Sequence, residues 1–156
     1  MTGRAQVQSE KQRLDDTFKR ASGVKGDAEL SSDFARHLCV LTSGFLEQAI
    51  IELPLEYVRL RSSAEIQRHV GQRLRRFTSP KTSKIIDLFG SFDPGWQLDL
   101  KAYLVDEYKD AVDGVVSLRH LIAHGRNTVV TMSSALSYYD RVKKVVDHIA
   151  ELCLPA

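Results

Sequence analysis

The sequence predicts an all-α protein, a compact bundle of about five to seven helices. Apolar residues recur at spacings of three and four along nearly the whole chain, and the sustained alternation typical of strands is missing from it. The 156 residues, 43% hydrophobic and 27% charged, have the size and composition of one globular domain. We therefore expect a single domain over residues 1–156, in which residues 1–27 form a less ordered N-terminal helix.

The first two expected helices differ in how much of their surface is apolar. One covers residues 8–21 and ends at the glycines that follow, and the next covers residues 28–54, where Pro54 ends or kinks it. On a helical wheel this second helix has two nearly opposite apolar stripes, which are Leu30, Phe34, Leu38, Leu41 and Phe45, and Cys39, Leu46, Ile50 and Leu53. A helix that is apolar on both sides must be covered on both sides. It therefore either lies at the centre of the bundle or packs against a partner subunit.

The remaining helices are bounded by proline, glycine and capping residues. Ser79–Pro80 and Asp93–Pro94 are cap and first-turn signals, and Gly125 is expected to close the longest helix. The expected helices cover residues 64–77, 81–89, 100–124 and 133–152, with residues 127–131 as an extended connector.

The net formal charge of +2 hides a strong asymmetry along the chain. Between Arg59 and Lys84, eight lysines and arginines accompany a single acid, Glu65. Between Asp87 and Asp113, seven acids accompany two lysines. One part of the surface is therefore suited to a polyanion, unless the two segments are solvated neighbours that balance each other.

The cysteines and the hydropathy of the chain indicate a cytoplasmic protein outside the membrane. Cys39 and Cys153 lie in apolar helical contexts with no further thiol to complete a metal site, so we expect free buried thiols in a reducing compartment. Residues 1–16 lack the apolar core of a secretory signal. The most apolar stretch, residues 35–55, contains an arginine, two glutamates and a proline, which we interpret as too polar for a membrane span.

The segment SLRHLIAHGRN, residues 117–127, places a guanidinium on an apolar helix face. On an ideal helix, Arg119 lies at the middle of an arc that extends about 60° to either side and holds Tyr108, Val112, Val115, Val116, Ile122 and Ala123. A guanidinium is costly to bury unpaired, so this position demands a carboxylate, a carbonyl cluster or a phosphate. Glu47, on the doubly apolar helix, is the auxiliary carboxylate that we nominate. A functional pocket and a structural ion pair both meet the requirement.

The spacing of Arg119 and His124 matches the R-x4-6-H signature of a ribonuclease-linked family, but spacing alone carries no information. About one match is expected by chance in a chain with this many arginines and histidines, and Arg141 with His148 is indeed a second match. The context of the first match distinguishes it. Arg119 is followed by the polar His120, and His124 directly precedes a glycine, so it lies in the last helical turn, where exposed carbonyls favour a protonated imidazole.

Longer phrases around this motif carry a resemblance. SLRHLIAHGRN, preceded by LTSGFLEQAIIEL and followed by TMSSALSYYDRVKKVVDHI, resembles the HEPN superfamily, and most closely its RiboL-PSP-type branch, over about residues 28–152. The resemblance implies a small helical bundle that forms a homodimer. It also implies a metal-independent endoribonuclease of toxin–antitoxin, antiphage or RNA-processing systems, with RNA and a cognate antitoxin or other protein as partners.

The resemblance makes Arg119 and His124 the catalytic pair and His120 an auxiliary polar residue. Arg126 stands where HEPN toxins with nucleotidyltransferase antitoxins carry a tyrosine, so regulation through that tyrosine is not expected. Within one helix, Arg119 and His124 diverge by about 140° and by about 7.5 Å of rise, so one chain has difficulty bringing both to one phosphate. Two facing copies can build the site between them, with the apolar arc around Arg119 as an isologous interface.

The chemistry expected of such a site needs no metal or cofactor. The 2′-hydroxyl of RNA attacks the neighbouring phosphate, and an imidazole can deprotonate it or protonate the leaving 5′-oxygen. Arg119 stabilises the charge of the transition state, and the products are a 2′,3′-cyclic phosphate and a 5′-hydroxyl. Arg126 and the basic segment, here Arg73, Arg75 and Arg76, are expected to bind the RNA backbone.

Several alternatives stay open at this stage. His120 and His124 have the spacing of a zinc-binding helix, with Asp113 two turns earlier, although no glutamate follows His120 as in H-E-x-x-H. Arg119 can be an ion-paired interface residue while His124 only ends a helix. A non-catalytic HEPN-like dimer that binds RNA, nucleotides or a protein partner also fits the sequence.

Overall fold

The computed structural model describes residues 3–23 and 27–155, and in this part of the chain it contains seven α-helices and no strand. The all-α prediction is confirmed. The helices are α1 (Gly3–Ser22), α2 (Ala28–Arg59), α3 (Ala64–Leu74), α4 (Thr82–Gly90), α5 (Pro94–Tyr103), α6 (Asp106–Ala123) and α7 (Met132–Cys153). The expected connector over residues 127–131 joins α6 to α7 without regular structure.

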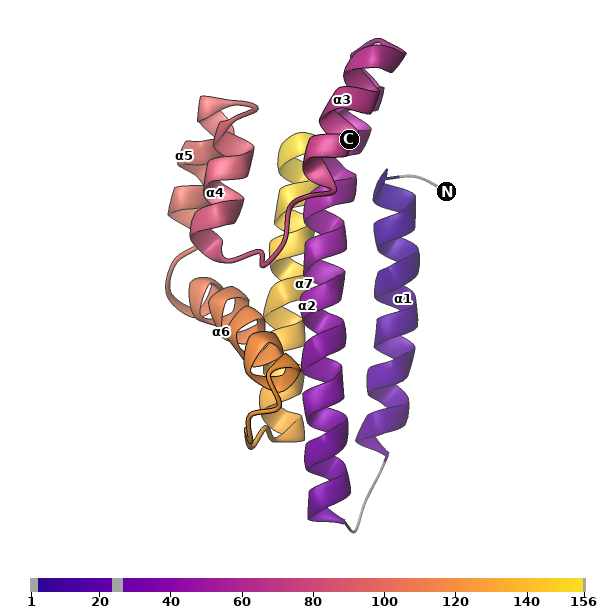
Figure 1. The fold of residues 1–156 in the computed structure, drawn as a ribbon, viewed down its shortest axis with the longest axis vertical. Coiled ribbons are helices and arrows are strands. Elements are labelled where there is room, and N and C mark those ends of the chain that lie inside the picture. Colours follow the sequence, from indigo (N-terminus) through magenta and orange to yellow (C-terminus); the bar gives the residue numbers. More distant parts are fainter. Residues whose placement is uncertain (1–2, 24–26, 156) are drawn as a thin grey trace.

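The long helix α2 is the axis of the bundle (Figure 1). It contacts α1, α3, α6 and α7, and α1 and α7 run alongside it. Leu46, Ile50 and Leu53 are fully buried, so the second apolar stripe of α2 is covered within one chain. The first stripe is covered only in part, because Leu30 and Phe34 keep exposed fractions of 44% and 37%.

The helix α2 passes through Pro54 without ending and continues to Arg59. By length and composition it is apolar enough to cross a membrane, so our interpretation of residues 35–55 as too polar was too strict. However, 67% of its most apolar window is buried inside the bundle. Burial of this kind is typical of the core helix of a soluble protein, and the apolar composition of α2 has a sufficient cause in the fold.

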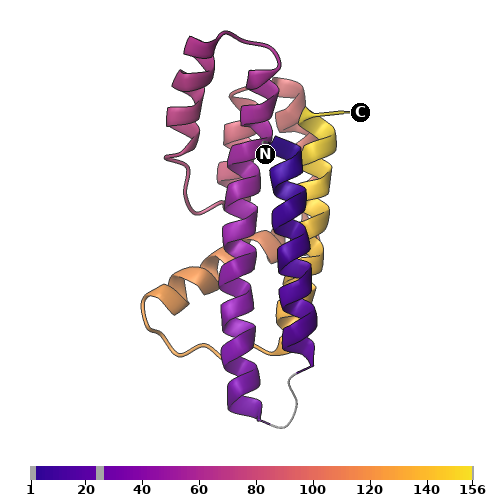
Figure 2. The same cartoon turned by 90° about the vertical axis from the view of Figure 1, so that its right-hand side faces the viewer.

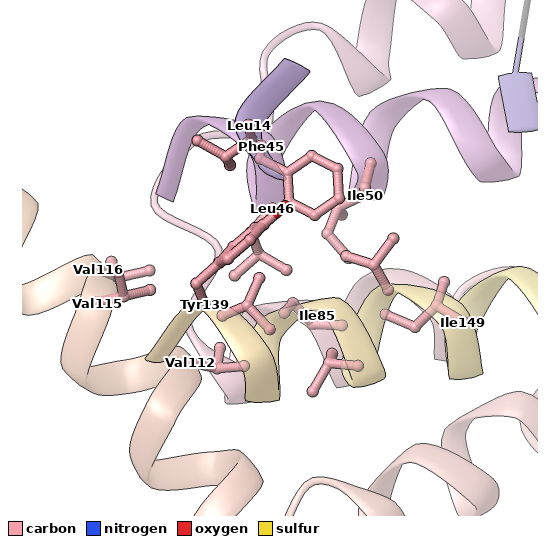
Figure 3. Close-up of a cluster of buried hydrophobic side chains, with 14 of the residues drawn as sticks. Leu14, Phe45, Leu46, Ile50, Ile85, Val112, Val115, Val116, Tyr139 and Ile149 are labelled. Carbon is pink, nitrogen blue, oxygen red and sulfur yellow. The ribbon is translucent and has the colours of Figure 1, made fainter. Parts of the chain in front are cut away.

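The core lies where α2, α6 and α7 meet, as Figure 3 shows for side chains of all three helices. Val112, Val115 and Val116 of α6 have exposed fractions of 0%. Our expectation that the apolar arc around Arg119 forms an isologous interface is therefore wrong for these three valines. Their apolar surface is already removed from water by α2 and α7 of the same chain.

The single helix expected over residues 100–124 is wrong as well, because the chain breaks between α5 and α6. Leu104 leaves the helical conformation and is 2% exposed, and Asp106 has a positive φ of 50°. Asp tolerates this left-handed conformation better than most residues do. No glycine or proline marks the break, which lets both Leu100 and Leu104 reach the core from the α4–α5 hairpin.

The N-terminal helix is an integral part of the bundle. In α1 the ring of Phe18 stacks on that of Tyr139 at 4.3 Å, and the Tyr139 hydroxyl donates to Oδ1 of Asp15 at 2.6 Å. Lys143 also reaches Asp15, at 3.2 Å. Residues 3–22 therefore pack against α2 and α7. Residues 1–2 and 24–26, which belong to the same expected segment, lie outside the described residues.

Both cysteines are free and buried, as the sequence predicts. Burial raises the pKa of the Cys39 thiol to about 11 and that of Cys153 to about 12. Thiols in such surroundings stay protonated at neutral pH and are poor nucleophiles.

We predict that Tyr139→Phe lowers the free energy of unfolding by about 1–2 kcal/mol at pH 7, because Asp15 loses a hydrogen-bond donor. Burial on its own would raise the pKa of Asp15, but the bonds from Tyr139 and Lys143 hold it below the ordinary value of 3.8. The contribution of Asp15 is therefore present above that value and is lost as the pH falls through its lowered pKa. Urea denaturation at pH 7 measures the loss of stability in Tyr139→Phe, and the same experiment at acidic pH measures how far the contribution of Asp15 is lost.

Tyr138→Phe is the matched control for this prediction. The Tyr138 hydroxyl has no hydrogen-bond partner in the described part of the chain, so its removal should leave the unfolding midpoint unchanged. Equal destabilisation by the two variants would show that Asp15 does not hold α1 on α7.

Candidate functional site

The end of α6 has a well-defined geometry that places His124. His124 is the C-cap residue, and Gly125 follows with a positive φ of 69°. The backbone N–H of Arg126 donates to the carbonyl of Leu121 at 3.0 Å, and that of Gly125 donates to the carbonyl of Ile122 at 3.1 Å. This pair of bonds is a Schellman motif, which only a residue with positive φ completes without strain. The prediction that Gly125 closes the helix is confirmed, and the His124 side chain is exposed at this end.

Arg119 precedes His124 by about one and a half helical turns. It is half-buried and lines a groove of about 540 Å³ between α1, α2 and α6. Glu47 lines the same groove, as do Glu10 and Arg13 of α1. In the described part of the chain the Arg119 guanidinium has no ion pair and no hydrogen bond. The structure thus brings Glu47 and Arg119 to one groove, as expected, but without the direct ion pair that we nominated.

Glu47 and His120 are joined through a residue that the sequence analysis missed. Ser79, in the connector between α3 and α4, has its Oγ 2.9 Å from Nε2 of His120. The backbone N–H of Ser79 donates to Oε2 of Glu47 at 3.4 Å. Glu47 and His120, the two auxiliary residues expected from the sequence, therefore belong to one network, and His120 directly follows Arg119.

The same connector is bound to α6 at a second point. The backbone N–H of Thr82, the first residue of α4, donates to Oδ1 of Asp113 at 2.8 Å. The N-cap residue of α4 is Lys81, which supplies no side-chain acceptor. The helix begins within one residue of its expected start. The prediction that Ser79 caps it is wrong, because the Ser79 hydroxyl is directed to α6 and an acid of α6 replaces it at the cap.

The zinc-site alternative is not supported by this arrangement. Among the described residues, no group of three or more His, Cys, Asp or Glu side chains is placed to hold a metal ion. Asp113 and His120 instead bind the α3–α4 connector.

The arginines expected to bind RNA are exposed. Arg73, Arg75 and Arg76 lie at the end of α3, and Arg126 follows α6. Figure 2 shows that α3 stands apart from the bundle and that the C-terminal part of α6 projects to the same side. Within the described ranges, no ion pair joins the basic segment to the acidic residues 87–113. The two segments therefore do not neutralise each other by direct contact.

The chain matches the model of the RiboL-PSP-HEPN family over residues 5–154. The protein belongs to this family. The match includes α1, which the resemblance seen in the sequence did not cover. No curated protein and no solved structure matches the chain. A HEPN domain indicates a ribonuclease-type or otherwise RNA-related function.

The second R-x4-6-H match of this HEPN domain has structural contacts. His148 Nε2 lies 2.5 Å from Oδ1 of Asp99, and its ring stacks on Tyr103 at 3.7 Å. Arg141 donates to Oγ of Ser137 at 2.6 Å. His148 is a mid-helix residue, as predicted, and it joins α7 to α5, whereas the Arg141 bond lies within α7.

Three residues of the candidate site could not be recognised as site residues from the sequence. Glu10 and Arg13 reach the groove only because α1 packs along α2. Ser79 was visible only as a cap signal, and its role depends on the left-handed backbone conformation that it adopts, with a φ of 54°.

We predict that Gly125→Ala lowers the free energy of unfolding by about 1 kcal/mol, because alanine is strained at positive φ. Gly71→Ala is the matched control. Gly71 lies inside α3, where an added Cβ meets its nearest atoms at 3.6 Å, an ordinary van der Waals distance, so alanine there should raise stability by about 0.5–1 kcal/mol. Thermal unfolding compares the two variants, and destabilisation of similar size in both would contradict the assigned helix end.

Proposed function

We propose that this HEPN domain is a metal-independent endoribonuclease that cleaves single-stranded RNA, with Arg119 and His124 as its catalytic residues. The observation that best supports this proposal is that Arg119 is half-buried without an anionic partner. Its guanidinium is half-buried beside a groove and has no carboxylate partner within the described chain. A guanidinium that is partly desolvated and has no carboxylate partner is well suited to bind a phosphate group. It can do so through two parallel hydrogen bonds.

The proposed reaction needs only proton transfer and charge stabilisation. The 2′-oxygen forms a bond to phosphorus as its proton passes to a base, and the bond from phosphorus to the 5′-oxygen breaks as that oxygen receives a proton. An imidazole such as that of His124 performs either transfer, and Arg119 stabilises the negative charge that develops on the phosphate oxygens. The exposed position of His124 leaves it accessible to RNA.

We further propose that two copies of the chain form the site together. Six residues of α2 lie on one side at alternating spacings of four and three, the pattern of a helix-packing seam: Leu30, Phe34, His37, Leu41, Gly44 and Gln48. Leu30 and Phe34 are exposed apolar side chains, and the space above Gly44 is open. A second copy seated on this seam covers the groove of Arg119 and can supply the other half of the Arg/His pair.

The basic residues are proposed to guide RNA to this site. Arg73, Arg75, Arg76 and Arg126 are exposed. The first three lie at the end of α3, and α3 stands on the side of the bundle to which the end of α6 projects (Figure 2). Exposed arginines attract a polyanion over distances of about 10 Å at moderate salt. We propose a cytoplasmic toxin or antiphage effector, controlled by a cognate antitoxin or another partner protein.

A non-catalytic HEPN-like dimer that binds RNA, nucleotides or a protein is the second candidate. The observation that favours it concerns His124, whose imidazole has no hydrogen-bond partner in the described part of the chain. Catalytic histidines are commonly oriented by a partner on the second ring nitrogen. Such a protein would keep the groove and the basic surface without turnover.

We predict that the purified protein cleaves single-stranded RNA in the presence of EDTA and that His124→Ala slows cleavage at least about a hundredfold, because general acid–base catalysis is lost. His148→Asn is the matched control. It removes the histidine of the second motif, which contacts Asp99 and Tyr103, and should leave cleavage intact. Gel assays of labelled RNA measure both rates, and size-exclusion chromatography verifies folding. Full activity in His124→Ala would refute the assignment.

A mixing experiment tests the two-chain site. Arg119→Ala and His124→Ala should each be inactive alone. If each site takes its arginine and histidine from different chains, half of the randomly mixed dimers have one intact site of two, so co-refolding restores about a quarter of wild-type activity. No recovery, with heterodimers verified by mass, would place both residues of a site in one chain.

A further inference from the structure

We propose that Ser79 is a positioning residue that fixes the imidazole of His120 beside Arg119. Its catalytic consequence rests on the ribonuclease function proposed above, whereas the contact itself does not. The direct observations are the 2.9 Å separation between Oγ of Ser79 and Nε2 of His120, and the bond from the Ser79 backbone N–H to Glu47.

The backbone at Ser79 is strained, and the strain requires a cause. Ser79 has a φ of 54°, and it precedes Pro80, a position that normally adopts an extended conformation. Residues held in such conformations persist only where their surroundings enforce them. Here Pro80 is buried and Thr82 is bonded to Asp113, so the chain is held in place directly after the serine contact with α6. The conformation directs the hydroxyl to His120 instead of to the cap of α4.

A hydroxyl is suited to this task because it can donate and accept. It can donate to, or accept from, Nε2 of the neutral imidazole, and it accepts from Nε2–H of the protonated one. The contact therefore survives a change of charge on His120. It leaves Nδ1 as the ring nitrogen without a partner in the described chain. Glu47 acts one step further away, because its carboxylate binds the backbone of Ser79 and not the imidazole.

The fixed imidazole is well placed for the proposed reaction. His120 follows Arg119 directly, and on an ideal helix it lies about 40° from His124 on the same face, one turn away. Cleavage needs one group to accept a proton and another to donate one. A positioned His120 supplies a second imidazole on the face of α6 that carries His124.

The contact is tested by NMR of protein labelled with ¹⁵N-histidine, comparing wild type with Ser79→Ala and Ser79→Gly. Glycine adopts positive φ freely, so the glycine variant removes the hydroxyl and the strain together. We expect the Nε2 resonance of His120 to shift in both variants, while that of His148, which Asp99 holds, does not. Ser83→Ala is the matched control, because Ser83 is an exposed serine of α4. An unchanged His120 resonance in both Ser79 variants overturns the proposal.

The consequence for catalysis is tested in the same proteins. Loss of one hydrogen bond to a working side chain should lower kcat roughly three- to tenfold, with little change in KM. A shifted His120 resonance with wild-type kcat means that the contact is only structural, and overturns the positioning role. If wild-type protein cleaves no RNA, the ribonuclease proposal fails, while the NMR comparison still decides whether Ser79 holds His120.

Discussion

The candidate site depends on the burial of one face of α6. Val112, Val115 and Val116 are removed from water by α2 and α7, which anchors the first half of the helix in the core. A guanidinium cannot lose its charge and is costly to bury unpaired, so full burial of this face stops before Arg119. The last turn therefore projects from the bundle, as Figure 2 shows, and His124 lies in solvent.

The opposite, polar face of α6 is held by the α3–α4 connector. Asp113 accepts from the backbone of α4, and His120, about two helical turns later, contacts Ser79. Apolar contacts determine how deeply α6 lies in the bundle but are not directional. Hydrogen bonds are directional and so determine the rotation of the helix about its axis. The two kinds of contact together direct Arg119 to the groove that it shares with Glu47.

Sequence patterns predicted the parts of the structure that arise from local causes. Asp93 caps α5, Gly125 ends α6, and the doubly apolar α2 lies at the centre, because caps, glycines and helical periodicity act within a few residues. The break after Tyr103 was not predictable in this way. It arises because Leu104 gains burial in a core made by distant helices, and no nearby residue marks it.

The sequence by itself determined the helical class, the family and the identity of Arg119, His120 and His124 as the unusual residues of an apolar segment. Only the tertiary structure decided that the valines around Arg119 are core rather than interface, and that Ser79 contacts His120 instead of capping α4. Helical periodicity shows which face of a helix is apolar. It does not show which neighbour covers that face, because contact with any apolar partner removes the same surface from water. Only the tertiary structure identifies the partner.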